Sequence, residues 1–123
     1  MSHVLLIGTA KDTQDLFSTM LGTTVSYTDY AGAVTSFCTK SPELTVVQLD
    51  ENDLVPGARI IECLHTAHMA NLAVLKAERT SGLMVAATVA GADWILANPA
   101  PEDLTNMVQN LLQRPPLACC WDT

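Results

Sequence analysis

The sequence contains few positively charged residues. Six Lys and Arg stand against thirteen Asp and Glu in 123 residues, which gives a net charge of -7 and a pI near 4.6. An acidic chain repels phosphate backbones and anionic lipid surfaces, and no cluster of basic residues offsets that charge. We therefore expect a protein that binds neither nucleic acid nor membrane surfaces directly.

Long apolar runs are also absent. No stretch approaches the roughly 20 apolar residues that span a bilayer, and residues 1–7 lack the charged segment and the longer apolar run of a signal peptide. Cysteine is sparse, with four residues scattered through the chain, a usage that favours reduced thiols over a disulfide framework. Together these features predict a cytoplasmic protein.

Hydrophobic residues, by contrast, make up 49% of the chain, enough for one sizeable core at this length. Short apolar runs alternate with longer amphipathic stretches, which predicts repeated βα units on a parallel sheet covered on both faces. The predicted fold class is α/β, a single doubly wound five-stranded parallel sheet. The predicted strands cover residues 3–8, 23–28, 44–49, 71–76 and 93–96. The predicted helices cover residues 11–21, 30–39, 57–68, 82–90 and 101–113.

The chain ends in a segment that does not continue this pattern. Arg114-Pro115-Pro116 stops the last helix, because proline lacks the backbone N–H and clashes with the preceding turn. We expect one domain over residues 1–113 and a C-terminal tail or the start of a linker over residues 114–123. Cys119 and Cys120 belong to that tail, since adjacent cysteines do not easily meet disulfide geometry.

The stretch A-G-A-D-W-I-L-A-N-P at residues 90–99, followed by A-P-E-D-L, resembles the C-terminal hallmark of response-regulator receiver domains. In that family the pattern reads A-G-A-D-x-[YF]-[LI]-x-K-P-[FA], and the lysine before the proline contacts the phosphoryl group. The resemblance spans nearly the whole chain. It implies the receiver, flavodoxin-like architecture, whose pocket lies beyond the C-terminal ends of the strands.

Several positions of the receiver phosphorylation pocket are substituted. Asn98 stands in place of the lysine, and Gly8 and Thr9 replace the two acidic residues that ligate Mg²⁺ after the first strand. The hydroxyl residue after the fourth strand aligns with Ala77. Because Mg²⁺ needs carboxylate oxygens, the resemblance implies a pseudo-receiver that is not an enzyme, lacks standard aspartyl phosphorylation, and binds no metal or cofactor.

The acceptor aspartate of the family has two possible counterparts. The lead-in P-E-L at residues 42–44 places it at Gln48, whereas matching V-V-Q-L-D at residues 46–50 places it at Asp50. We favour Gln48, because that spacing needs no insertion. Side chains 48 and 50 lie on the same face of a strand, so both can border the pocket. An atypical receiver phosphorylated on Asp50 remains an alternative.

Two other patterns permit ligand binding. The loop at residues 8–13 resembles the flavodoxin phosphate loop, and hydroxyls at a helix start can hold an anionic cofactor. Against this, the loop lacks a second glycine, and Asp12 and Asp15 place negative charge where a phosphate would lie. The pattern C-x-H-x-x-H at Cys63, His65 and His68 contains zinc-binding side chains. Only His65 and His68 have the spacing to face each other on a helix, so we interpret all three as surface residues.

The predicted helix at residues 82–90 contains no charged residue, although a helix on one face of a sheet normally shows solvent a polar side. In receivers the face of the fourth helix, fifth strand and fifth helix binds partners or a second copy. We therefore predict a protein-interaction or homodimer surface there. Its predicted residues are Leu83, Met84, Ala87, Thr88 and Trp94. The simpler explanation is that exposed alanines and threonines need no partner.

Overall fold

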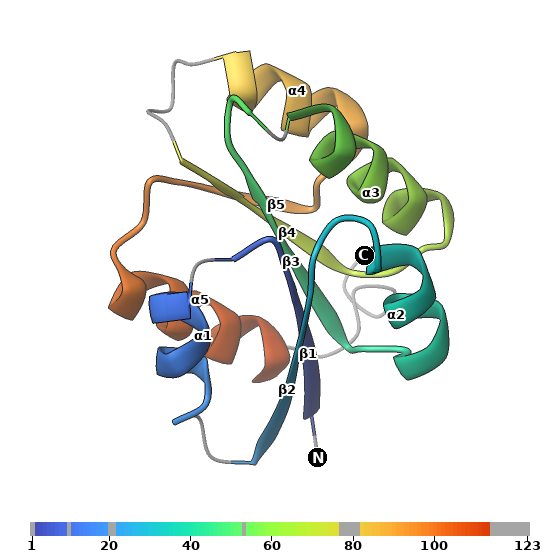
Figure 1. The fold of residues 1–123 in the computed structure, drawn as a ribbon. Coiled ribbons are helices and arrows are strands. Elements are labelled where there is room, and N and C mark those ends of the chain that lie inside the picture. The colour runs from blue at the N-terminus through green and yellow to red at the C-terminus, as the bar shows by residue number, and fades with distance from the viewer. Residues whose placement is uncertain (1, 10, 20–21, 53, 77–81, 114–123) are drawn as a thin grey trace, which may run out of the picture.

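The computed structural model describes residues 2–9, 11–19, 22–52, 54–76 and 82–113. Within them, strands and helices alternate along the chain (Figure 1). The strands are β1 (Ser2–Ile7), β2 (Thr23–Thr28), β3 (Leu44–Leu49), β4 (Asn71–Leu75) and β5 (Trp94–Ala97). The helices are α1 (Lys11–Phe17), α2 (Ala33–Lys40), α3 (Leu54–Thr66), α4 (Gly82–Ala90) and α5 (Pro101–Gln113).

The strands form one parallel sheet in the order β2-β1-β3-β4-β5. Parallel neighbours need a crossover connection, and each crossover here contains a helix. Every strand therefore runs the same way, so all their carboxyl ends lie at one edge of the sheet. The predicted doubly wound α/β fold is confirmed.

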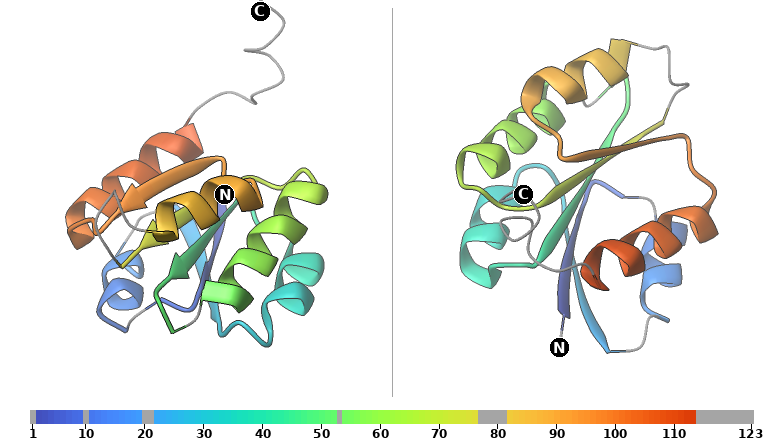
Figure 2. Two further views of the ribbon diagram at one scale, coloured as in Figure 1. Left: turned by 90° about the horizontal axis from the view of Figure 1, so that it is seen from above. Right: turned by 180° about the vertical axis from the view of Figure 1, so that it is seen from behind.

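Two apolar clusters hold the helices on the two faces of the sheet. One joins β1, β3 and β4 to α2, α3 and α4, and the other joins the same strands to α5 and to Phe17 of α1. Figure 2 shows the two layers on opposite sides of the sheet. Every residue of β3 and β4 is buried, which explains their nearly continuous apolar sequence. None of the described helices is long and apolar enough to span a bilayer.

The ends of three helices differ from the sequence prediction. The α2 helix starts at Ala33 rather than 30, because residues 29–32 form a turn in which the Gly32 N–H donates to Asp29 Oδ1 at 2.9 Å. The α3 helix starts at Leu54 rather than 57, since a proline such as Pro56 is tolerated in a first turn. The α1 helix ends at Phe17, where the Ser18 hydroxyl donates to the carbonyl of Asp15. Residues 20–21 and 114–123 lie outside the described part of the chain.

At the amino edge of the sheet, the A-G-A-D segment ties α4 and β5 to β4. Asp93 Oδ2 accepts the backbone N–H of fully buried Asn71 at 3.0 Å, and Asn71 Oδ1 accepts the N–H of Asp93 at 3.3 Å. Gly91 has a φ of +102°, and a Cβ added there would lie 2.6 Å from Cγ of His65. This segment thus needs a glycine for backbone conformation and for close packing, and its aspartate satisfies buried polar groups.

Candidate functional site

Three polar residues follow neighbouring strands at the carboxyl edge. Asp50, Lys76 and Asn98 come directly after β3, β4 and β5. The register brings them level, because Leu49 pairs with Leu75 and Leu75 with Ala97. The ladder extends to them, with Lys76 N–H donating to Leu49 O at 2.9 Å and Asn98 N–H donating to Leu75 O at 2.7 Å. A carboxylate, an ammonium group and an amide therefore lie in one row.

Gln48 does not belong to the row formed by Asp50, Lys76 and Asn98. It lies inside β3, is only 9% exposed, and pairs with Val74 of β4. Its backbone carbonyl accepts the hydroxyl hydrogen of Tyr30. Asp50, by contrast, is half-buried, and its Oδ1 accepts the N–H of Asn52 at 2.9 Å in the loop after the strand. Of the two residues, Asp50 is the one level with Asn98. Ala77 lies outside the described residues.

Gly8 is tightly constrained at the end of β1. Its φ is +69°, in the left-handed region that favours glycine. A Cβ added at Gly8 would lie 2.5 Å from Cζ and 2.6 Å from the hydroxyl oxygen of Tyr30. The Tyr30 ring therefore leaves no room for a carboxylate side chain at this position, and the left-handed backbone disfavours most side chains other than asparagine and aspartate.

In the described part of the loop after β1, Thr9 has a buried side-chain oxygen. Thr9 Oγ1 is buried with no hydrogen-bond partner among the described residues, and the Thr9 carbonyl accepts Gln14 Nε2 at 3.2 Å. The following helix, α1, has seven residues. The anionic-cofactor interpretation of residues 8–13 stays a prediction, since one hydroxyl oxygen does not identify a ligand.

Asn98 also has a left-handed backbone, with a φ of +47°. Asparagine tolerates this conformation better than most residues, because its short polar side chain bonds locally. The local backbone thus suits the asparagine that stands where the resemblance implies a lysine.

The orientation of α4 buries some of the residues that were predicted to form an interaction surface. Leu83 and Ala87 belong to the core, with 3% and 0% of their surface exposed, and half-buried Met84 packs against the same cluster. Leu83 and Ala87 are therefore not part of a free surface, whereas Met84 remains partly exposed. Thr88 is exposed and donates its hydroxyl hydrogen to Met84 O at 2.9 Å.

The outward side of α4 is nevertheless apolar. Val85 and Val89, one helical turn apart, are 64% and 80% exposed. Trp94 on β5 is half-buried and packs against the cluster that contains α5. The sequence identified the uncharged helix and its exposed Thr88 but not Val85 and Val89, because apolar residues lie on every side of the helix.

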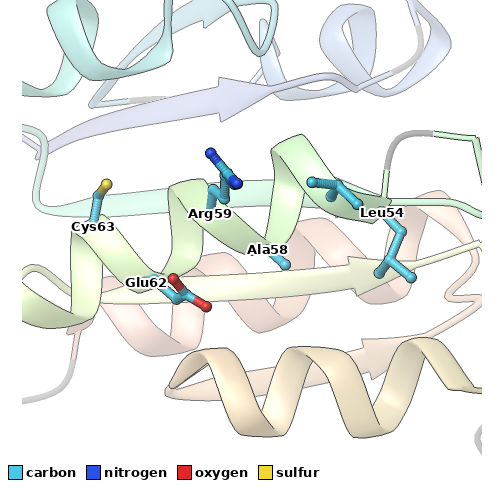
Figure 3. Close-up of a pocket in the computed structure, with 6 residues that line it drawn as sticks. Leu54, Ala58, Arg59, Glu62 and Cys63 are labelled. Atoms are coloured by element: carbon cyan, nitrogen blue, oxygen red, sulfur yellow. The ribbon is translucent and has the colours of Figure 1, made fainter.

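A shallow hollow lies along α3 (Figure 3). Its described lining residues all belong to this helix: Leu54, Val55, Ala58, Arg59, Glu62 and Cys63. Figure 3 shows Arg59 and Cys63 pointing to one side of the helix and Glu62 to the other. Because one helix alone provides these side chains, the hollow is an open surface feature rather than an enclosed binding site.

The residues Cys63, His65 and His68 are exposed. His65 lies against Gly91, and His68 has left the helix with a φ of +58°. Among the described residues, no group of three or more His, Cys, Asp or Glu side chains has a metal-binding arrangement. His68 therefore does not continue the helical spacing on which a shared ion would depend.

Sequence reasoning missed two residues of the carboxyl edge, Tyr30 and Lys76. Tyr30 was assigned to a helix, although it lies in the turn before α2 and reaches across β1 and β3. No linear pattern links it to Gly8. Lys76 was placed inside a strand, and only the register shows that it is level with Asp50.

Solved structures show the same arrangement of elements. A CheY-like protein, TadZ, from Pseudomonas aeruginosa is 19% identical with a TM-score of 0.71, and the match covers 94% of this chain and 97% of that one. The response regulator domain of Thermotoga maritima CheB is 15% identical with a TM-score of 0.75, over 94% and 99%. A receiver domain protein from Methanospirillum hungatei is 19% identical with a TM-score of 0.72, over 91% and 94%.

No protein-family model and no curated protein matches the sequence. The structural matches span nearly all of both chains, but their low identity means that they establish the fold and not the chemistry. The chain therefore has the fold of CheY-like response-regulator receiver domains.

Proposed function

We propose that the chain is a cytoplasmic signalling module that acts by binding proteins, without catalysis and without standard aspartyl phosphorylation. The observation that carries this proposal is the composition of the carboxyl edge. Gly8 and Thr9 stand where receivers have two metal-binding carboxylates, and Asn98 stands where they have a lysine. Receiver phosphorylation needs both the metal and the cation, because positioned charges stabilise the transferring phosphoryl group.

We infer that Asp50, rather than Gln48, occupies the acceptor position. The register supports this assignment, because Asp50 is level with Asn98 whereas Gln48 lies two residues earlier inside β3. This revises the preference for Gln48 that spacing alone suggests. It also makes Asp50 the residue at which the alternative, an atypical phosphorylated receiver, must be tested.

The phosphorylation test uses a small phosphodonor. The protein is incubated with acetyl phosphate and Mg²⁺ and analysed by intact-mass spectrometry, with Asp50→Asn as the matched control. We expect no stable phosphoryl adduct on either protein. An Mg²⁺-dependent adduct on the wild type that is missing from Asp50→Asn would overturn the proposal and establish the phosphorylated alternative.

We further propose that partner binding or self-association uses the outward side of α4, centred on Val85 and Val89. This helix carries no charged residue, whereas α1, α2, α3 and α5 each carry at least one. Two copies of a chain with net charge -7 repel each other, so an uncharged face is where they approach at the lowest electrostatic cost. Depletion of charge is also typical of interface centres.

The test places a charge on that face. Val85→Glu should weaken association by roughly tenfold or more, because an unpaired carboxylate would be buried at the contact. Val34→Glu is the matched control, since Val34 is also an exposed valine but lies on α2. Analytical ultracentrifugation measures self-association, and circular dichroism checks the fold. Equal association of both variants would exclude this face, and a wild type that stays monomeric would exclude the homodimer.

A further inference from the structure

Tyr30 lies where three segments meet at the carboxyl edge. It belongs to the turn between β2 and α2, and its hydroxyl donates to the backbone carbonyl of Gln48 in β3. Its ring lies over Gly8 at the end of β1. Its Cε1 would be 3.5 Å from a Cβ added at Gly57, in the first turn of α3. One side chain thus contacts β1, β3 and α3.

The surrounding backbone directs the ring into this place. The Gly8 N–H donates to Thr28 O at 3.0 Å, which fixes the end of β2 beside the end of β1. Two turn bonds follow, from Gly32 N–H to Asp29 Oδ1 at 2.9 Å and from Ala33 N–H to Tyr30 O at 3.4 Å. The ring therefore enters from a turn that is itself hydrogen-bonded, rather than from a loose loop.

Gly8 provides the space for the ring, whereas Gly57 makes room for Leu49 beside it. A methyl group at Gly8 would overlap it, and Gly57 packs closely against the side chain of Leu49. In a receiver the counterpart of Gly8 carries a carboxylate that, through the metal ion, connects β1 to the acceptor residue after β3. Here an uncharged aromatic side chain connects these two strands.

We propose that Tyr30 is a built-in lock of the pocket, which replaces a metal ion as the cross-link between β1, β3 and α3 and holds them in one arrangement without any ligand. This inference rests on the proposed function, because a pocket that still bound Mg²⁺ for phosphoryl transfer would not have a ring in that space. A neutral cross-link also needs no counter-ion, so the pocket is stable without metal.

The first test is a double-mutant cycle between Gly8→Ala and Tyr30→Ala. Gly8→Ala should lower stability more in the wild type than in the Tyr30→Ala background, where the ring is gone and only the left-handed backbone remains unfavourable. Gly22→Ala measures that backbone effect alone, since Gly22 has a φ of +73° and nothing within 4 Å of an added Cβ. Additive effects would show that the ring does not occupy the space beside Gly8.

The second test separates a lock from an ordinary packed residue. Amide hydrogen exchange at Ala58–Ile61 of α3 should speed up about tenfold in Tyr30→Ala and less in Tyr30→Phe, which keeps the ring and loses only the hydroxyl. Tyr27→Ala is the control, because Tyr27 is 42% exposed and donates its hydroxyl hydrogen to Gln14 O instead. Unchanged exchange in Tyr30→Ala, or equal exchange in both alanine variants, would overturn the proposal.

The third test restores the carboxylates. Isothermal titration calorimetry with MgCl₂ should show binding by the triple variant Gly8→Asp/Thr9→Asp/Tyr30→Ala and none by Gly8→Asp/Thr9→Asp with Tyr30 in place. Equal binding by both variants, or binding by neither, would contradict the assignment of the ring to the metal position. A phosphoryl adduct on the wild type would instead overturn the proposed function, even if the cycle shows that Tyr30 contacts Gly8.

Discussion

The amino and carboxyl edges of the sheet carry different parts of the receiver pattern. At the amino edge, Gly91 and Asp93 of the A-G-A-D segment pack against His65 and bond to buried Asn71. At the carboxyl edge, we propose that Gly8, Thr9 and Asn98 stand where receivers have their charged groups, and the Tyr30 ring lies beside Gly8. The A-G-A-D part of the family-like segment thus supports the scaffold at one edge, whereas Asn98, from the same segment, lies at the edge with the candidate pocket. A scaffold motif therefore predicts a fold without predicting chemistry.

A side chain added at Gly91, at the amino edge, should have a large effect on stability. Gly91→Ala should lower the free energy of unfolding by about 2 to 3 kcal/mol, because its left-handed backbone and the contact with His65 both oppose a Cβ. Gly22→Ala keeps the unfavourable backbone without the contact. Urea denaturation of both variants gives the difference, and equal losses would show that the His65 contact contributes nothing.

Removing one carboxylate from each edge compares them directly. Asp93→Ala should cost about 2 kcal/mol, since the backbone N–H and the side-chain amide of buried Asn71 lose the carboxylate oxygen to which they donate. Asp50→Ala should cost less than about 1 kcal/mol, because it removes a bond within an exposed loop. Urea unfolding measures both losses. A larger loss of unfolding free energy in Asp50→Ala than in Asp93→Ala would show that the carboxyl edge also stabilises the fold.

Placing a lysine at position 98 should slightly lower the stability of the protein. Asn98→Lys should lower stability by about 1 kcal/mol, because a φ of +47° suits asparagine better than a long side chain. Asn98→Gly should be neutral within about 0.5 kcal/mol, since glycine adopts this conformation freely. Urea denaturation gives the free energy of unfolding of both variants. A lysine variant as stable as the wild type would mean that the backbone relaxes at this position.

The smallest expected effect is that of Mg²⁺. Millimolar MgCl₂ should shift the melting temperature of the wild type by less than about 1 °C, because Gly8 and Thr9 offer no carboxylate to bind the ion. NaCl at matched ionic strength controls for general screening. A larger shift with MgCl₂ than with NaCl would show that Mg²⁺ binds preferentially to the folded state, which contradicts the proposal that the carboxyl edge lacks a metal site.

The sequence predicted the scaffold well, because hydrophobic periodicity is a local signal. The ranges of α4, α5, β2 and β3 agree with the sequence prediction. Helix phase was harder to predict, since α4 has apolar residues on every side. Leu83 and Ala87 are therefore in the core, and Val85 and Val89 are exposed.

The arrangement of residues at the carboxyl edge could not be predicted from local sequence patterns. Spacing alone left Gln48 and Asp50 as alternatives, and the pairing of β3, β4 and β5 was needed to place Asp50 level with Asn98. The contact between Tyr30 and Gly8 joins residues 22 positions apart through a turn. Such contacts arise from the tertiary arrangement, which the residue types alone do not specify.

The left-handed backbone at Gly8 and Asn98 bears on the mutational paths open to this sequence. A lone carboxylate at position 8 would meet the Tyr30 ring, and a lone lysine at position 98 would meet an unfavourable φ without a metal-bound phosphoryl group to contact. Either substitution is therefore expected to destabilise the protein before it provides any activity. A mutational path to a phosphorylatable pocket would first have to replace Tyr30, because only then does position 8 have room for a side chain.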